Sequence, residues 1–131
     1  MKTKHLLFAL LSILFIYACN EKPNGCKSMK TGKFEYIDTL QNQSYGIERN
    51  DSIQIEYNYS NNTKSIFRIK WINDCEYTLQ LDSSREEMTK FYDSKLLHVK
   101  ILEVYPDGYR FSAILDGYDQ VLIQTFKRVK E

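Results

Sequence analysis

The sequence predicts an all-β domain: an antiparallel up-and-down meander of about eight strands that closes into a small barrel, with one short helix between strands five and six. Three observations support this prediction. After Gly32, apolar residues recur at every second position, which is typical of half-buried strands. Turn-forming residues separate these alternating runs. A single segment, before residue 95, breaks the pattern.

The alternating runs define the strands. In the clearest run, Ile53, Ile55 and Tyr57 are separated by polar residues. Asp116-Gly117 lies between two such runs and is a strong hairpin signal. The expected strands cover about 33–38, 44–50, 52–59, 64–72, 75–82, 95–105, 109–115 and 118–129. Because sequential strands joined by short turns usually pair with their neighbours, the meander is expected to close on itself as a barrel.

The segment between the fifth and sixth strands predicts a short helix over about 84–92. Ser84 precedes Glu87 by three residues, as in a capping box. Met88 and Tyr92 are four residues apart and would share one face of that helix. The alternative for this segment is an irregular loop.

The N-terminus has the features of a signal peptide. Lys2 and Lys4 form a positive region, and the apolar run 6–18 follows, ending in the small residue Ala18. This run is too short to cross a bilayer comfortably, because a helix needs about 20 residues to span the hydrocarbon. We therefore expect export. An ordinary signal peptide and an uncleaved anchor are the alternatives to the lipoprotein signal described next.

The residues Ile16, Tyr17, Ala18 and Cys19 resemble the lipobox of bacterial lipoproteins. The resemblance implies that Cys19 becomes the lipid-modified first residue of the mature protein. Several acyl chains would anchor it to the membrane, because one chain gives only marginal binding. Asn20 follows instead of Asp, and by resemblance to the common Gram-negative sorting rule this favours the outer over the inner membrane. The expected organisation is a signal peptide over 1–18, a lipidated tether over 19–25 and a β-barrel domain over 26–131.

Cys26 and Cys75 remain as an even pair in an exported chain, which predicts a disulfide. Counting strands up and down places both at the same end of the barrel, with Cys26 just before the first strand and Cys75 at the start of the fifth. The segment 26–32 would then cross and close that end. The alternatives are two unpaired buried thiols or a metal site that includes His98.

Gly32-Lys33-Phe34 opens the first strand, and Arg128 lies near the end of the last one. This arrangement resembles lipocalin-like barrels, in which a Gly-x-Trp motif opens the first strand and its ring packs under a basic residue of the final strand. Here Phe34 replaces the tryptophan. The resemblance implies a lipocalin-like barrel in which Arg128 covers Phe34.

The mature chain also resembles a group of small lipoproteins of Gram-negative bacteria whose function is not established. The shared features are a cysteine shortly before Lys-x-Gly-x-Phe, here Cys26 and 30–34, and a later Trp-x-x-Asp-Cys-x-Tyr, here 71–77. Some similar chains carry a "DNA topoisomerase IV" label. The residues do not support that label, because such an enzyme needs large domains, a DNA cleft and a cytoplasmic address.

No motif in the chain indicates catalysis. There is no phosphate-binding glycine loop, no nucleophile elbow and no His-Glu-x-x-His metal motif. His98 would be the one histidine left after removal of the signal peptide. The formal net charge of +1 gives no electrostatic footprint for nucleic acid. We therefore expect no enzyme activity, no catalytic residues, no cofactor, no metal and no nucleic-acid partner.

A binding role is the remaining expectation. The strand count places the longer connections at the end opposite the disulfide, and loops on a rigid scaffold often carry function. Each tyrosine at that end would offer a ligand an apolar body with a polar tip. The tyrosines expected there are Tyr45, Tyr59, Tyr92 and Tyr118. We expect a monomer that binds a small apolar ligand or a glycan at this mouth. The alternatives are tyrosines that only cover strand ends, and a structural or protein-interaction lipoprotein of the cell envelope without a small ligand.

Overall fold

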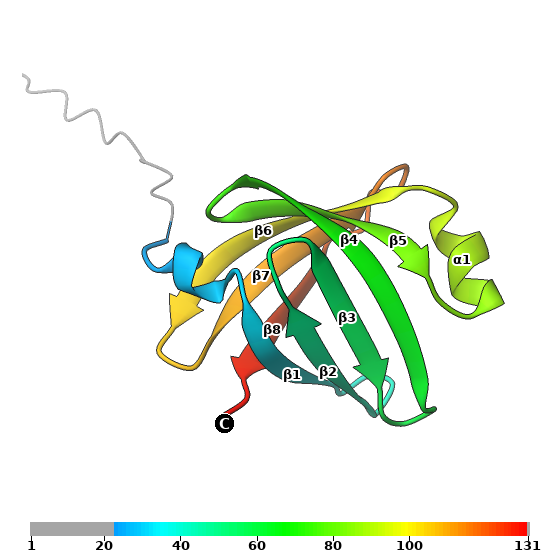
Figure 1. Ribbon diagram of the computed structural model, residues 1–131, viewed down its shortest axis with the longest axis horizontal. Helices are drawn as coiled ribbons and strands as arrows, with labels where there is room; N and C mark the ends of the chain where they lie inside the picture. The colour runs from blue at the N-terminus through cyan, green and yellow to red at the C-terminus, as the bar shows by residue number, and fades with distance from the viewer. Residues whose placement is uncertain (1–22, 131) are drawn as a thin grey trace, which may run out of the picture.

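The computed structural model describes residues 23–130 and contains a closed eight-stranded antiparallel barrel with strictly sequential neighbours (Figure 1). The predicted fold class is therefore confirmed. The predicted signal peptide and the predicted lipidation site, Cys19, lie outside the described residues, as does most of the predicted tether. Within the described residues, no helix is long and apolar enough to cross a membrane.

The elements follow one another as the alternating pattern predicts, with boundaries within a few residues. In chain order they are the 3-10 helix η1 (Cys26–Met29), β1 (Gly32–Asp38), β2 (Gln43–Arg49), β3 (Ile53–Asn58), β4 (Thr63–Asn73), β5 (Glu76–Ser83), α1 (Glu86–Tyr92), β6 (Leu96–Tyr105), β7 (Gly108–Leu115) and β8 (Leu122–Arg128).

Two local predictions were wrong. The last strand begins at Leu122, which pairs with Ala113, and not at residue 118. The capping box at the helix is absent because α1 begins after Arg85 without a side-chain cap. The Ser84 hydroxyl instead shares a hydrogen bond of 2.6 Å with the Ser65 hydroxyl, which ties the start of the helical segment to β4.

The third strand has its polar residues inside the barrel. Gln54 is 1% exposed and Asn58 is 8% exposed, whereas Ile53 on the other face is 38% exposed. The register explains this orientation, because Gln54 lies opposite the inward Phe67 of β4. The apolar residues of β3 thus face outward, although alternation usually directs them to the core.

One end of the barrel, here called the closed end, is covered by η1 (Figure 1). Cys26 and Cys75 form the predicted disulfide, with Cα atoms 5.2 Å apart. Cys26 and Met29 of η1 are both buried against the barrel core. The disulfide therefore fixes the segment that closes this end, as the strand count predicts, and it excludes the alternatives with free thiols or a cysteine metal site.

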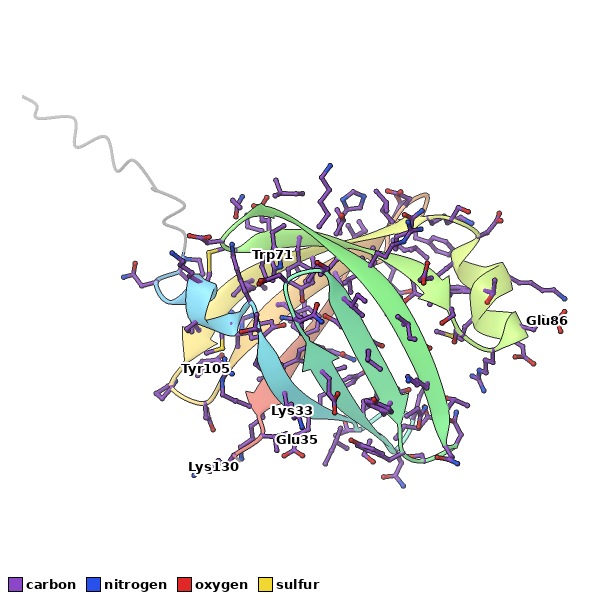
Figure 2. The ribbon with its side chains drawn as sticks, viewed as in Figure 1. Lys33, Glu35, Trp71, Glu86, Tyr105 and Lys130 are labelled. Atoms are coloured by element: carbon purple, nitrogen blue, oxygen red, sulfur yellow. A yellow bond between two sulfur atoms is a disulfide. The ribbon has the colours of Figure 1, made fainter. Side chains whose placement is uncertain are left out.

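The opposite end, here called the open end, carries α1 and the connections β1–β2, β3–β4 and β7–β8 (Figure 1). Side chains fill the barrel between its two ends, with Trp71 toward the closed end and Glu86 of α1 at the open end (Figure 2). The fully buried members of the core are mostly large: Phe34, Ile47, Phe67, Tyr77, Leu79, Ile101 and Tyr109.

The seam between the first and last strands closes the barrel. β1 and β8 pair at Phe34 with Arg128 and at Glu35 with Lys127, both near the closed end. Toward the open end, a hollow of about 370 Å³ lies between the two strands and includes Ile37 and Ile123 in its lining. The barrel wall is therefore less continuous at this seam than between any two sequential strands.

Candidate functional site

A cavity of about 190 Å³ opens at the open end of the barrel. Its lining is mostly polar and comes from β2, β3, β4 and the start of α1: Gln41, Gln43, Tyr45, Glu56, Asn58, Thr63, Ser65, Arg85 and Met88. The cavity is smaller than the roughly 300–1,000 Å³ of pockets for drug-sized ligands. It therefore has room for a small molecule only.

Glu56 brings an acidic group to this cavity. It points inward from β3, between Ile47 on β2 and Ser65 on β4. The Gln54 amide Nε2 donates a hydrogen bond of 2.8 Å to Glu56 Oε1. Burial raises the pKa of the Glu56 carboxyl, although the bond from Gln54 and the charge of Arg49 each lower it. The carboxylate is thus held at a net electrostatic cost.

The orientation of Gln54 is set by Arg49, a buried arginine that is 5% exposed. Arg49 Nε donates to Gln54 Oε1 at 2.8 Å. Because a guanidinium has donors and no acceptor, the Gln54 oxygen must face Arg49. The Gln54 NH₂ group must then face Glu56. Arg49, Gln54 and Glu56 therefore form one chain of hydrogen bonds from the closed half of the barrel to the cavity.

Three more donors of Arg49 are also occupied. Nη1 donates to the Met29 carbonyl at 3.0 Å, and Nη2 donates to the hydroxyls of Tyr77 at 3.0 Å and Tyr109 at 2.7 Å. The guanidinium carbon also lies 4.9 Å from the Tyr77 ring centre and 5.4 Å from that of Phe34. Burial lowers the pKa of Arg49, but the two tyrosines together with the charge of Glu56 more than reverse that effect, so the group stays charged. The Arg49 guanidinium therefore bonds to groups of the barrel core and is not part of the cavity lining.

Aromatic rings lie close to the cavity. Tyr45 stacks on Tyr36 with ring centres 4.6 Å apart and planes 4° from parallel. Tyr92 of α1 packs edge-on against Phe67 of the core at 5.5 Å. Burial, with Glu56 as a further cause, raises the pKa values of Tyr36, Tyr45 and Tyr92. Of these three tyrosines, Tyr45 is the one that lines the cavity together with Glu56.

The polar rim of the cavity is partly pre-organised. The Tyr45 hydroxyl donates to Gln43 Oε1 at 2.6 Å, and Asn58 Nδ2 donates to the same oxygen at 3.0 Å. Asn58 Oδ1 accepts from the backbone of Ser60 at 3.0 Å, which fixes the β3–β4 turn. These bonds hold the rim side chains in place before any ligand arrives.

The four tyrosines predicted at the mouth lie at the open end, but they do not form one site. Tyr45 lines the cavity, and Tyr92 lies inside against the core. Tyr59 is 65% exposed and stacks on the outward Tyr57, because it has the outward parity of β3. Tyr118 is 45% exposed and lies beside Phe91 on the surface. The structure thus brings only the first pair to the interior.

Arg49, Gln54 and Glu56 were not predicted as site residues from the sequence. The signal was present in the run Gln54-x-Glu56-x-Asn58, whose period is the same as that of its apolar neighbours. Alternation defines two faces of a strand but does not say which face is inside when one is apolar and the other is polar and bulky. The pairing with β2 and β4 decides this here.

A larger hollow of about 590 Å³ lies on the outside of the closed end, between the start of β1 and the end of β8. Its side-chain contributors include Lys33, Asp107, Arg128 and Lys130. Arg128 is already engaged, because it donates to the Ser28 carbonyl at 2.6 Å and covers the Phe34 ring at 4.8 Å. That last contact is the one expected from the lipocalin resemblance. The hollow lacks converging inward polar groups and is not the candidate site.

His98 belongs to the outer surface. Its Nε2 lies 2.7 Å from Asp116 Oδ1, and both side chains are about half exposed. The backbone N–H of Leu96, followed by His98, lowers the pKa of Asp116. Among residues 23–130, no group of three or more His, Cys, Asp or Glu side chains is placed to hold a metal ion.

Comparison of the chain with protein-family models, curated proteins and solved structures gives no match.

Proposed function

We propose that the chain is a lipid-anchored lipoprotein of the cell envelope that binds a small ligand, without catalysis, in the cavity at the open end of its barrel. The single observation that carries the proposal is the cavity itself: a pre-organised polar hollow with a carboxylate inside it. A barrel that served only as a rigid spacer would be more stable with apolar side chains at these inward positions, because buried polar groups and charges are costly.

The lining supports one of the two expected ligand classes. Gln43, Asn58 and Glu56 present amide and carboxylate groups to the cavity. These groups suit hydroxyls and other polar groups of a ligand. Glu56, which accepts one hydrogen bond from Gln54, would keep unpaired acceptor positions against a hydrocarbon. The proposal is therefore a small polar ligand, of glycan type or similar polarity, in place of an apolar one.

A matched pair of variants tests the proposal. Ser65→Tyr fills the cavity from β4, whereas Lys64→Tyr places the same side chain on the outer face of that strand. Binding is measured by NMR on the full-length chain, titrated with fractionated polar small molecules from an envelope extract. The proposal expects shifts at cavity residues in the wild type and in Lys64→Tyr, and none in Ser65→Tyr. Equal binding by both variants, or no cavity shifts with any fraction, would overturn it.

A second candidate function, a protein-interaction role, is favoured by the seam. Apolar side chains near the open part of the β1–β8 seam are exposed, among them Ile37 at 68%, Leu40 at 97% and Ile123 at 55%. Exposed apolar patches often mark interaction surfaces. Crosslinking in intact envelopes tests this role. It expects one defined protein adduct that Ile37→Lys together with Ile123→Lys removes, and an unchanged adduct would argue against the seam.

A further inference from the structure

We infer that the ligand of the cavity carries a positively charged amine, which binds at the Glu56 carboxylate. This inference rests on the proposed function, because it names the chemical class that the same cavity accepts. It depends on three observations: the free acceptor capacity of the Glu56 carboxylate, the Tyr45 ring in the same cavity lining, and the other charges around the cavity.

The first observation concerns the hydrogen bonds of Glu56. Gln54 donates to Oε1, and none of the ion pairs within residues 23–130 includes Glu56. An ionised carboxylate has about four acceptor positions. Arg49, the nearest fixed cation along the hydrogen-bond chain, directs its donors to Gln54, to Met29 and to two tyrosines. Glu56 therefore has acceptor capacity left for a donor that enters the cavity.

The second observation concerns the rings. Tyr45 lines the same cavity as Glu56. Tyr36 stacks on Tyr45 and on Phe126 behind it, so Tyr45 is the ring that a ligand in the cavity can reach. The faces of tyrosine rings attract cations within about 6 Å of the ring centre. An ammonium group gains from both the carboxylate and the Tyr45 ring. A neutral hydroxyl gains from the carboxylate alone, and an anion is repelled by it.

The third observation concerns the rest of the charges. Asp38 lies on the inward face of β1 at the same end and influences Tyr36 and Tyr45 electrostatically. Arg85 supplies a positive charge and lines the cavity just before α1. Its side chain is about half exposed, and its Nε lies 3.9 Å from Glu87 Oε2. Glu56 is therefore the acidic group of the cavity lining, and Arg85 lies at the rim, where a polar or anionic tail of the ligand would leave the cavity.

Two probes of the same size isolate the charge. trans-4-Aminocyclohexanol carries an ammonium where trans-1,4-cyclohexanediol carries a hydroxyl, and both carry one hydroxyl at the opposite ring position for the polar rim. Both are titrated into the full-length wild-type chain, Glu56→Gln and Glu35→Gln. Glu35 lies on the outer face of β1 and serves as the matched control, because its loss removes the same charge outside the cavity.

A charge-assisted bond is worth roughly tenfold to a hundredfold in affinity. We expect the amine to bind at least about tenfold more tightly than the diol to the wild type and to Glu35→Gln. Glu56→Gln should remove that preference. Wild-type NMR shifts at Tyr45 and Ser65 on adding the amine would locate it even if Glu56→Gln failed to fold.

Equal binding of the two probes would overturn the cationic class while leaving the proposed small-ligand function in place. The absence of amine binding, or amine shifts outside the cavity, would also overturn the inference. The cavity-filling pair Ser65→Tyr and Lys64→Tyr judges the proposed function independently.

Discussion

The guanidinium of Arg49 and the carboxylate of Glu56 lie on the inner face of the barrel and are joined through one side chain, the amide of Gln54, by bonds of 2.8 Å on each side. Direct contact would neutralise the carboxylate as an internal ion pair. The Gln54 amide instead fixes the orientation of the Glu56 carboxylate and leaves it facing the cavity. The arrangement thus couples the packed, closed half of the barrel to its polar, open half.

Removing Arg49 should destabilise the protein strongly. In Arg49→Met, Gln54 Oε1 and the Met29 carbonyl lose their donor inside the barrel. We expect a loss of about 3 kcal/mol in the free energy of unfolding, measured with urea. Arg68→Met is the control, because Arg68 is exposed and pairs with Asp82 on the surface, and it should cost under about 0.5 kcal/mol. Equal costs for the two variants would show that the buried hydrogen bonds contribute little.

Replacing Glu56 by Gln should stabilise the folded protein at neutral pH. The pKa of Glu56 is raised above its usual 4.5 by burial, so the folded state resists ionisation. The stability that wild type gains from the neutral carboxyl is full below pH 4.5 and is lost as pH rises through the folded-state pKa. The unfolding free energy of Glu56→Gln relative to wild type should therefore increase with pH and then level off. A difference that stays constant from pH 4 to pH 8 would contradict this cause.

Removing the disulfide should cost much of the stability of the domain. Cys26 and Cys75 are 49 residues apart, and closing a loop of that length in the unfolded chain is worth about 4 kcal/mol in the entropic model. The double variant Cys26→Ser with Cys75→Ser should lose about that amount in urea unfolding. Dithiothreitol should lower the stability of the wild type toward that of the variant and leave the variant unchanged. A further loss in the variant would mean that the reductant acts elsewhere.

Two glycines should respond differently to substitution by alanine. A Cβ at Gly108 would overlap the backbone carbonyl of Phe126, so β7 and β8 would have to separate. A Cβ at Gly46 would meet the hydroxyl tip of Tyr59, an exposed side chain that can swing away. We expect Gly108→Ala to cost about 2 kcal/mol in thermal unfolding and Gly46→Ala to stay within about 0.5 kcal/mol. Similar losses in both would indicate that Tyr59 is held more firmly than its exposure suggests.

The fold could be predicted because its signals are local. Alternation with period two and turn residues such as Asp116-Gly117 are recognised over a few neighbouring residues. The even cysteine pair predicts a disulfide, and counting strands places both cysteines at one end. The start of β8 was harder to predict from the sequence. Residues 118–121 resemble a strand in composition, but no neighbouring strand pairs with them.

The site could be predicted only in its position. Tyr45 and the open end were identified, but Arg49 was not, because its partners are distant in the chain: Met29, Tyr77 and Tyr109 are 20, 28 and 60 residues away. A buried arginine is recognisable only once those acceptors are placed around it. Glu56 was missed for a related reason, since the polarity of β3 is inverted and only its strand neighbours reveal which face is inside.

The short pairing between β1 and β8 has a consequence for how the chain reaches this structure. That pairing joins Phe34 and Glu35 to Arg128 and Lys127, from opposite ends of the domain, so it carries the greatest loop-closure entropy of any strand pair. Hairpins between successive strands can form early, whereas this last pairing must wait for both ends. We expect the barrel to be finished at this point and, on mild destabilisation, to come apart here first. In amide hydrogen exchange, the seam would then exchange before the β4–β5 hairpin does.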